Sequence, residues 1–250
     1  MSVSVPGWHG DRMPISGGTG WTPGEVTAGR GGHRGGGGVV ACVAVAVVAL
    51  AVLHVDGAAT IDPAIRVISD YVALPGGYAL LGVAAVALAV AAGLLAAALR
   101  PTGLVDPAAP ATLLGTASGA LVAVAVFPTN DPGTSAGLVA NLHRMAGLVV
   151  LVTLPLGAWL VARRAVRTPA WRASAAVLGW VTVAGCVLSA GFLLSNILIV
   201  ISGSPFFTAL GALQRVLYAV VMVVLLLLAR AVRTAAAAAR PADARLRGMA

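Results

Sequence analysis

The sequence predicts an all-α polytopic membrane protein, a bundle of six transmembrane helices. Its 250 residues are 59% hydrophobic and only 10% charged, and the mean hydropathy of +0.97 lies far outside the range of soluble domains. The apolar runs are unbroken and rich in Ala, Leu and Val, whereas a membrane β-barrel would show alternating strands of about ten residues. Together these observations predict helices that cross a bilayer.

Six apolar runs are candidates to cross a hydrocarbon core of about 30 Å, which needs about 20 helical residues. The first run is short, the third is diluted by hydroxyl side chains, and only a short turn separates the fifth from the sixth. The runs are residues 39–55, 78–99, 108–127, 145–162, 176–201 and 206–229.

The segments that flank these runs are predicted to be tails. Residues 1–38 contain thirteen glycines, a composition that cannot bury enough apolar surface to offset chain entropy. We therefore expect a disordered tail over residues 1–38, a transmembrane domain over 39–229 and a basic tail over 230–250.

The distribution of charge predicts the orientation. All sixteen basic residues are arginines, and thirteen of them fall on the side of the amino terminus, where positive residues mark the cytoplasmic face. The sequence thus predicts a multi-pass protein of the cell membrane with both termini in the cytoplasm. This placement explains the net charge of +8 without a nucleic-acid partner; membrane lipids are the expected partners, and the oligomeric state stays open.

The first outer loop, residues 56–77, is predicted to hold a short helix that lies in the membrane interface. Asp62 followed by Pro63 is typical of a helix start, which places the helix over residues 63–71. Residues spaced by four share one face of such a helix. The polar face would consist of Asp62, Arg66 and Asp70.

A single charge, Arg215, lies inside the sixth apolar run. A charged side chain at bilayer depth costs at least ~2.5 to 3.5 kcal/mol, so such a residue usually faces the bundle interior and pairs with a partner. At 1.5 Å per helical residue it would lie roughly 14 Å below the outer boundary, within reach of Asp70 or Asp131. Two interpretations stay open: a structural ion pair, or an anchor for an anionic ligand or substrate.

Other polar residues gather on the outer face, and they divide into two candidate groups. Asp70, Asp131 and His143 are candidate catalytic residues, because a histidine and a perturbed carboxylate can exchange protons near neutral pH beneath a lipid head group. The candidate ligand-binding residues are Arg215, Gln214, Asn196 and Arg66.

No motif demands a metal or a cofactor. The three candidate catalytic residues could bind zinc, and His54 with His143 could hold a haem. Neither set has a diagnostic spacing such as CxxC or HExxH. The expectation is that the protein has no cofactor and no metal.

Four short motifs resemble one membrane family. They are ISD at residues 68–70, FPTND at residues 127–131, His143 and the pair Gln214-Arg215. They are similar to the six-span bacterial and archaeal family called domain of unknown function 998, over about residues 40–230. The family pattern reads FPTD, whereas here Asn130 precedes the acid. The resemblance implies a six-span fold and no settled activity. The ISD motif and His143 are also, more faintly, similar to the six-span damage-regulated autophagy modulator family.

Three classes of function stay open. The first is a non-enzymatic membrane protein that binds a lipid or a small hydrophobic or anionic molecule, or acts as a structural partner. The second is an intramembrane enzyme acting on a lipid or isoprenoid at the outer leaflet. The third is a small-molecule transporter, which usually shows inverted repeats and broken helices; here Pro155 is the one clear internal breaker. The sequence favours the first class, with the enzyme as runner-up.

Overall fold

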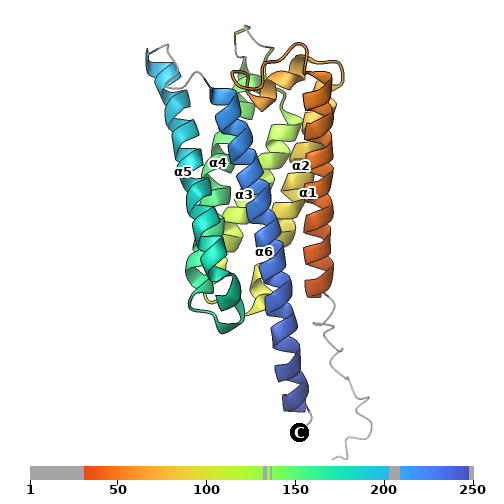
Figure 1. Ribbon diagram of the computed structural model, residues 1–250, viewed down its shortest axis with the longest axis vertical. Helices are drawn as coiled ribbons and strands as arrows, with labels where there is room; N and C mark the ends of the chain where they lie inside the picture. Colours follow the sequence, from red (N-terminus) through yellow and green to blue (C-terminus); the bar gives the residue numbers. More distant parts are fainter. Residues whose placement is uncertain (1–30, 132–133, 136, 203–208, 248–250) are drawn as a thin grey trace, which may run out of the picture.

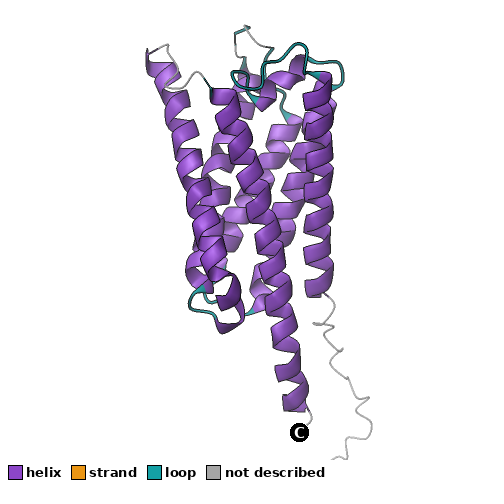
Figure 2. Cartoon of the chain, in the orientation of Figure 1, coloured by secondary structure: helices purple, strands orange, loops and turns teal. Residues whose placement is uncertain are grey.

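Six long helices run side by side through the protein (Figure 1). The computed structural model describes residues 31–131, 134–135, 137–202 and 209–247. Within these ranges all regular structure is helical (Figure 2), and six helices are long and apolar enough to cross a membrane. The predicted six-span α-bundle is confirmed. The elements are α1 (Gly31–Asp56), η1 (Ile68–Ala73), α2 (Gly77–Leu99), η2 (Arg100–Thr102), α3 (Ala108–Val126), α4 (Leu138–Ala165), η3 (Pro169–Trp171), α5 (Arg172–Ser202) and α6 (Leu210–Arg247).

The helices form a closed ring. Each helix packs against the next one in the sequence, and α6 returns to pack against α1. Helix α6 also contacts α2 and α4, and its lower end extends beyond the bundle in Figure 1. The interior is built from aliphatic side chains such as Leu95, Leu154 and Leu225, whereas valines such as Val48 and Val187 are exposed on the outside of the ring. This pattern suits a bundle whose outer surface faces lipid rather than water.

Helix α1 begins before the predicted boundary of the transmembrane domain. It starts at Gly31, inside the segment expected to be a disordered tail, of which residues 1–30 lie outside the described residues. Gly36 packs against α6 so closely that an added Cβ would meet the side chain of Arg233 and lie 3.3 Å from the carbonyl oxygen of Ala229. The missing side chain therefore lets the two helices approach each other below the apolar run.

Helix α6 continues past its apolar run to Arg247, through the segment expected to be a basic tail. The first part of this extension belongs to the core: Ala231, Val232 and Ala235 are at most 1% exposed. Alanine and arginine both favour helix, so nothing in this composition ends the helix at residue 229.

The short helix of the first outer loop is a 3-10 helix over Ile68–Ala73, not an α-helix over residues 63–71. After Asp62 the chain makes a single turn, in which the carbonyl oxygen of Asp62 accepts from the backbone N–H of Arg66 at 2.9 Å. Val67 is then extended, because the next backbone N–H, that of Ile68, bonds to α6 instead of continuing the turn. A tertiary contact thus overrides the local helix signal.

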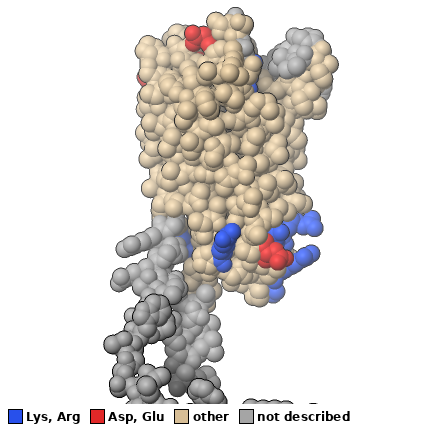
Figure 3. Space-filling view, turned by 180° about the vertical axis from the view of Figure 1, so that it is seen from behind, with Lys and Arg blue, Asp and Glu red and all other residues tan. Residues whose placement is uncertain are grey.

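Arginines gather at one end of the bundle, the lower end in Figure 3. This is the end at which α2 turns into α3 and α4 turns into α5. The opposite end carries the first outer loop and the α3–α4 connection. Among the described side chains, the arginines of the lower end are Arg100, Arg163, Arg164, Arg167, Arg172, Arg230 and Arg233.

Candidate functional site: an arginine beneath the first outer loop

Arg215 lies near the upper end of α6, closer to the helix start than predicted. The predicted depth of roughly 14 Å assumes a helix that starts at Phe206, whereas α6 begins at Leu210. Five residues of helix correspond to about 8 Å along the axis. The guanidinium therefore lies at the level of the first outer loop, which folds over it.

The guanidinium of Arg215 donates four hydrogen bonds to described residues, and each of these acceptors is neutral. Its Nε donates to Nε2 of His54 at 2.8 Å, and its Nη2 donates to the hydroxyl of Tyr71 at 3.0 Å. Its Nη1 donates to the carbonyl oxygens of Arg66 at 2.7 Å and Gly211 at 3.0 Å. The guanidinium carbon also lies 5.5 Å from the centre of the Tyr71 ring, within the range of a cation–π interaction.

The expected pairing of Arg215 with an acid is not found among the described residues. Asp70 has Oδ2 4.0 Å from Nε of Arg66 and accepts from the backbone N–H of Val67 at 3.2 Å. Asp131 is exposed in the α3–α4 connection. The loop brings backbone carbonyls and a tyrosine hydroxyl to the guanidinium, so these groups take the positions that carboxylates were expected to fill.

His54 is held as a neutral acceptor. An arginine can only donate, so Nε2 of His54 must carry a lone pair, and Nδ1, 2.7 Å from the carbonyl oxygen of Leu50, must carry the proton. The imidazole also lies against the Tyr71 ring, with 5.0 Å between ring centres. The positive charge of Arg215 is therefore not cancelled by any group to which it donates.

Hydrogen bonds to the loop backbone fasten the first outer loop to α6. The side-chain oxygen of Gln214 accepts from the N–H of Ile68 at 2.6 Å, and the N–H of Ala212 donates to the carbonyl oxygen of Ala64 at 3.0 Å. Gly211 lies directly against the loop, because a Cβ there would be 2.8 Å from the carbonyl oxygen of Pro63. The loop is thus a fixed cover over Arg215.

Below this cover, α1 and α6 leave an open groove of about 260 Å³, which we call the α1/α6 groove. Its walls are mainly aliphatic, and its polar end is formed by the outermost lining residue of each helix, His54 on α1 and Arg215 on α6. The α1 residues recur at helical spacing and so share one face. The lining residues are Val47, Leu50, Ala51, His54, Ile68, Arg215, Tyr218 and Met222.

The α3–α4 connection forms a separate polar cluster. Nδ1 of His143 lies 2.7 Å from the carbonyl oxygen of Phe127. Asn130 organises the loop: its side-chain oxygen accepts from Arg144 at 2.9 Å, and its amide donates to the carbonyl oxygen of Thr134 at 2.8 Å. No hydrogen bond or ion pair of the described residues joins this cluster to Asp70 or Arg215. The structure therefore does not bring the three candidate catalytic residues together.

The four candidate ligand-binding residues occupy different places. Arg215 lines the groove, and Gln214 and Arg66 hold the loop above it. Asn196 lies on α5 and donates its amide to the carbonyl oxygen of Phe192 at 2.8 Å, within its own helix. In the part of the chain that the structure describes, no three His, Cys, Asp or Glu side chains gather as a metal ion would require.

A family model described as "Protein of unknown function (DUF998)" matches residues 33–231. The chain belongs to the DUF998 family. The resemblance predicted from four short motifs is confirmed. No curated protein and no solved structure matches the chain.

In this DUF998 protein, the four motifs form two hydrogen-bonded pairs. The ISD motif meets Gln214-Arg215 through the bond from Ile68 to Gln214. The FPTND motif meets His143 through the carbonyl oxygen of Phe127. Each motif thus has a structural partner at the upper end of the bundle, although the two pairs remain apart.

Two residues of the site were missed or misjudged from the sequence. The sequence patterns did not indicate Tyr71, and they indicated His54 only as a possible haem ligand. The usable signal was position: His54 ends the first apolar run on the face where the sixth run begins, and Tyr71 directly follows the ISD motif. Both ring nitrogens of His54 are occupied, by Leu50 and Arg215.

Burial raises the pKa of Asp70 above the ordinary 3.8, and the charges of Arg66 and Arg215 and the N–H of Val67 only partly oppose it. The folded state therefore holds this proton more tightly than the unfolded state. Stability is expected to fall as the pH rises through the interval above the ordinary aspartate value, and to level off once Asp70 is ionised. Asp70→Asn is expected to remove this slope in thermal melts between pH 4 and 7. Asp131→Asn, at an exposed position, is the control; an unchanged slope in Asp70→Asn would contradict the assignment.

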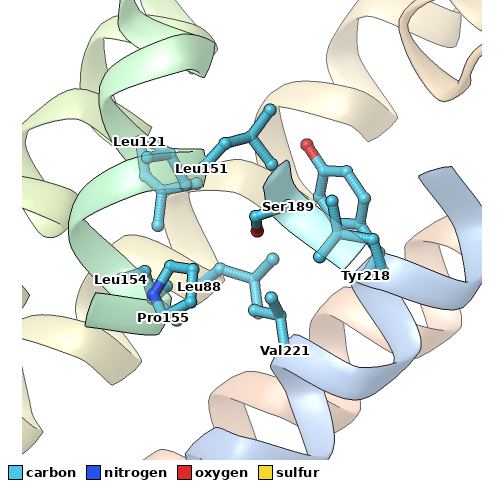
Figure 4. A pocket seen from close by; sticks show the side chains of 10 residues that line it. Leu88, Leu121, Leu151, Leu154, Pro155, Ser189, Tyr218 and Val221 are labelled. Atoms are coloured by element: carbon cyan, nitrogen blue, oxygen red, sulfur yellow. The ribbon is translucent and has the colours of Figure 1, made fainter. Parts of the chain in front are cut away.

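A second, smaller cavity of about 20 Å³ lies inside the bundle (Figure 4). Leucines dominate its lining, together with Pro155 of α4, Tyr218 of α6 and Ser189 of α5. Ser189 is 4% exposed, and its hydroxyl has no hydrogen-bond partner among the described residues. An unsatisfied hydroxyl in an apolar interior is destabilising.

Ser189→Ala is expected to stabilise the protein by about 1 kcal/mol, because it removes a buried polar group that gains no bond on folding. Ser195→Ala is the matched control on the same helix, since the Ser195 hydroxyl donates to the carbonyl oxygen of Gly191 at 2.8 Å. Thermal unfolding of both variants in detergent would show the contrast. A loss of stability in Ser189→Ala as large as in Ser195→Ala would overturn the assignment.

Proposed function

We propose that this DUF998 protein binds a lipid or a similar membrane-embedded small molecule in the α1/α6 groove. The observation that carries the proposal is the shape of the groove: an apolar trough about 260 Å³ in volume, open beside two helices, with Arg215 and His54 at one end. Ligand sites typically combine apolar walls with a few placed polar groups. A membrane lipid matches this arrangement, because its chain is apolar like the walls and its head group is polar like the end that holds Arg215 and His54.

The surrounding structure supports binding rather than simple packing. The first outer loop fixes the guanidinium of Arg215 from above through Arg66 and Tyr71, so the side chain does not need to be ordered when a ligand arrives. Preorganisation of this kind lowers the entropic cost of binding. Because the groove lies between the first and last helices of the ring, a ligand could enter sideways from the membrane.

Filling the groove tests the proposal. Ala51→Trp is expected to lower the amount of lipid retained by the purified protein, measured by native mass spectrometry, at least fivefold. Val48→Trp is the matched control, because Val48 is on the same helix, is 62% exposed and does not line the groove. Equal lipid retention in the two variants would refute a binding site between α1 and α6.

We also propose that the protein lies in the cell membrane with the arginine-rich lower end in the cytoplasm, and with Arg215 towards the outer leaflet. The positive-inside tendency supports this orientation. In intact cells, a membrane-impermeant thiol reagent is expected to label Thr134→Cys in the α3–α4 connection and to spare Arg167→Cys in the α4–α5 connection. For this assay Cys42 and Cys186, both free thiols, are first replaced by alanine. The reverse labelling pattern would invert the topology.

A further inference from the structure

We infer that the occupant of the α1/α6 groove is a bilayer lipid whose head group carries one net negative charge. The inference rests on the proposed function and adds the chemical class of the ligand. The argument depends on the charges around Arg215, on its unused hydrogen-bonding capacity and on the dimensions of the groove.

The charges around the groove leave one positive charge uncompensated. His54 is a neutral acceptor, and Tyr71, Arg66 and Gly211 offer Arg215 only a hydroxyl and backbone carbonyls. Asp70 lies 4.0 Å from the side chain of Arg66 and interacts electrostatically with both Arg66 and Arg215. One carboxylate balances only one of these two arginines, so one positive charge remains and a single negative charge on the ligand would neutralise the site.

Arg215 also keeps one hydrogen-bond donor for the ligand. A guanidinium has five N–H groups, and the four bonds described above use one on Nε, two on Nη1 and one on Nη2. The second hydrogen of Nη2 has no acceptor among the described residues. Arginine forms strong charge-assisted bonds to phosphate oxygens, so this hydrogen suits the phosphodiester of a lipid head group.

The dimensions favour a lipid over a free anion. From Arg215 to Met222 the wall of α6 rises by seven helical steps, or about 10 Å. The volume of about 260 Å³ is slightly below the roughly 300 to 1,000 Å³ of sites that enclose a whole drug-sized ligand. The groove would therefore hold the head group and the first part of one chain, while the rest of the lipid stays in the bilayer. A small free anion would leave the aliphatic wall without a partner.

The test measures head-group selectivity at a fixed chain composition. The full-length protein is placed in nanodiscs with equal amounts of phosphatidylglycerol, which carries one negative charge, and phosphatidylcholine, which is neutral overall; retained lipid is counted by native mass spectrometry. The wild type is expected to retain phosphatidylglycerol about tenfold more. Arg215→Gln is expected to bring this ratio close to one. Arg144→Gln, an exposed arginine at the same end of the bundle, is expected to keep it.

The outcomes separate this inference from the proposed function. If Ala51→Trp lowers retention of both lipids while the wild type shows no preference, the groove binds lipid but not through charge, and the inference is overturned alone. If Ala51→Trp changes nothing, both fail. The wild-type ratio needs no variant, so the inference stays testable even if Arg215→Gln does not fold. Loss of the preference in Arg144→Gln would also overturn it, because the selectivity would then belong to the surface.

Discussion

Arg215→Gln is expected to destabilise the protein by about 2 to 4 kcal/mol. Glutamine cannot reach all four acceptors, so the carbonyl oxygens of Arg66 in the loop and Gly211 in α6, together with Nε2 of His54, lose their donor. A fully buried acceptor left unsatisfied costs about 1 to 3 kcal/mol; the acceptors of Arg215 are partly buried, and that of Arg66 is exposed, so each contributes less than this and the loss is their sum. Removing an intramembrane charge offsets part of this loss, but the offset is small here, because Arg215 lies near the end of its helix and not at the bilayer centre. The measurement is thermal or denaturant unfolding in detergent.

The control for this prediction is Arg144→Gln. Arg144 is exposed, and its side chain donates to the side-chain oxygen of Asn130. Arg144→Gln is therefore expected to change the free energy of unfolding by less than about 0.5 kcal/mol. Hydrogen exchange gives a second readout, since Arg215→Gln is expected to raise exchange in the first outer loop and Arg144→Gln is not. Similar stabilities of the two variants would show that the four bonds of Arg215 do not hold the loop.

The number of spans could be predicted from the sequence because the length of an apolar run decides whether a helix can cross a bilayer. The ends of the helices could not, because they depend on packing. Helix α1 extends down to Gly31 alongside α6, where Gly36 lies against Arg233. Hydropathy does not show that two helices pack closely together outside their apolar runs, as α1 and α6 do here.

That Arg215 would be surrounded by polar partners was also predictable, since a lone charge in an apolar run is costly. The identity of these partners was not. Charge alone predicts an acid as the partner of an arginine, whereas the structure supplies the carbonyl oxygen of Arg66 and the side chains of His54 and Tyr71. Every residue has a backbone carbonyl, so the sequence cannot show which one will face the guanidinium. The loop must first dock on α6, and that docking also converts the expected α-helix into η1.

Gly211→Ala is expected to detach the first outer loop. A Cβ on Gly211 would collide with the backbone carbonyl of Arg66 and lie 2.8 Å from that of Pro63, and overpacking of this kind costs about 1 to 3 kcal/mol. By helix propensity alone, the same change would stabilise by about 1 kcal/mol. Gly191→Ala isolates that gain, because no atom lies within 4 Å of its added Cβ. The two variants should therefore shift the melting temperature in opposite directions, and Gly211→Ala should also weaken lipid retention. A higher melting temperature in both variants would mean that the loop moves away from α6 at little cost. The loop would then not hold Arg215 in place for a ligand.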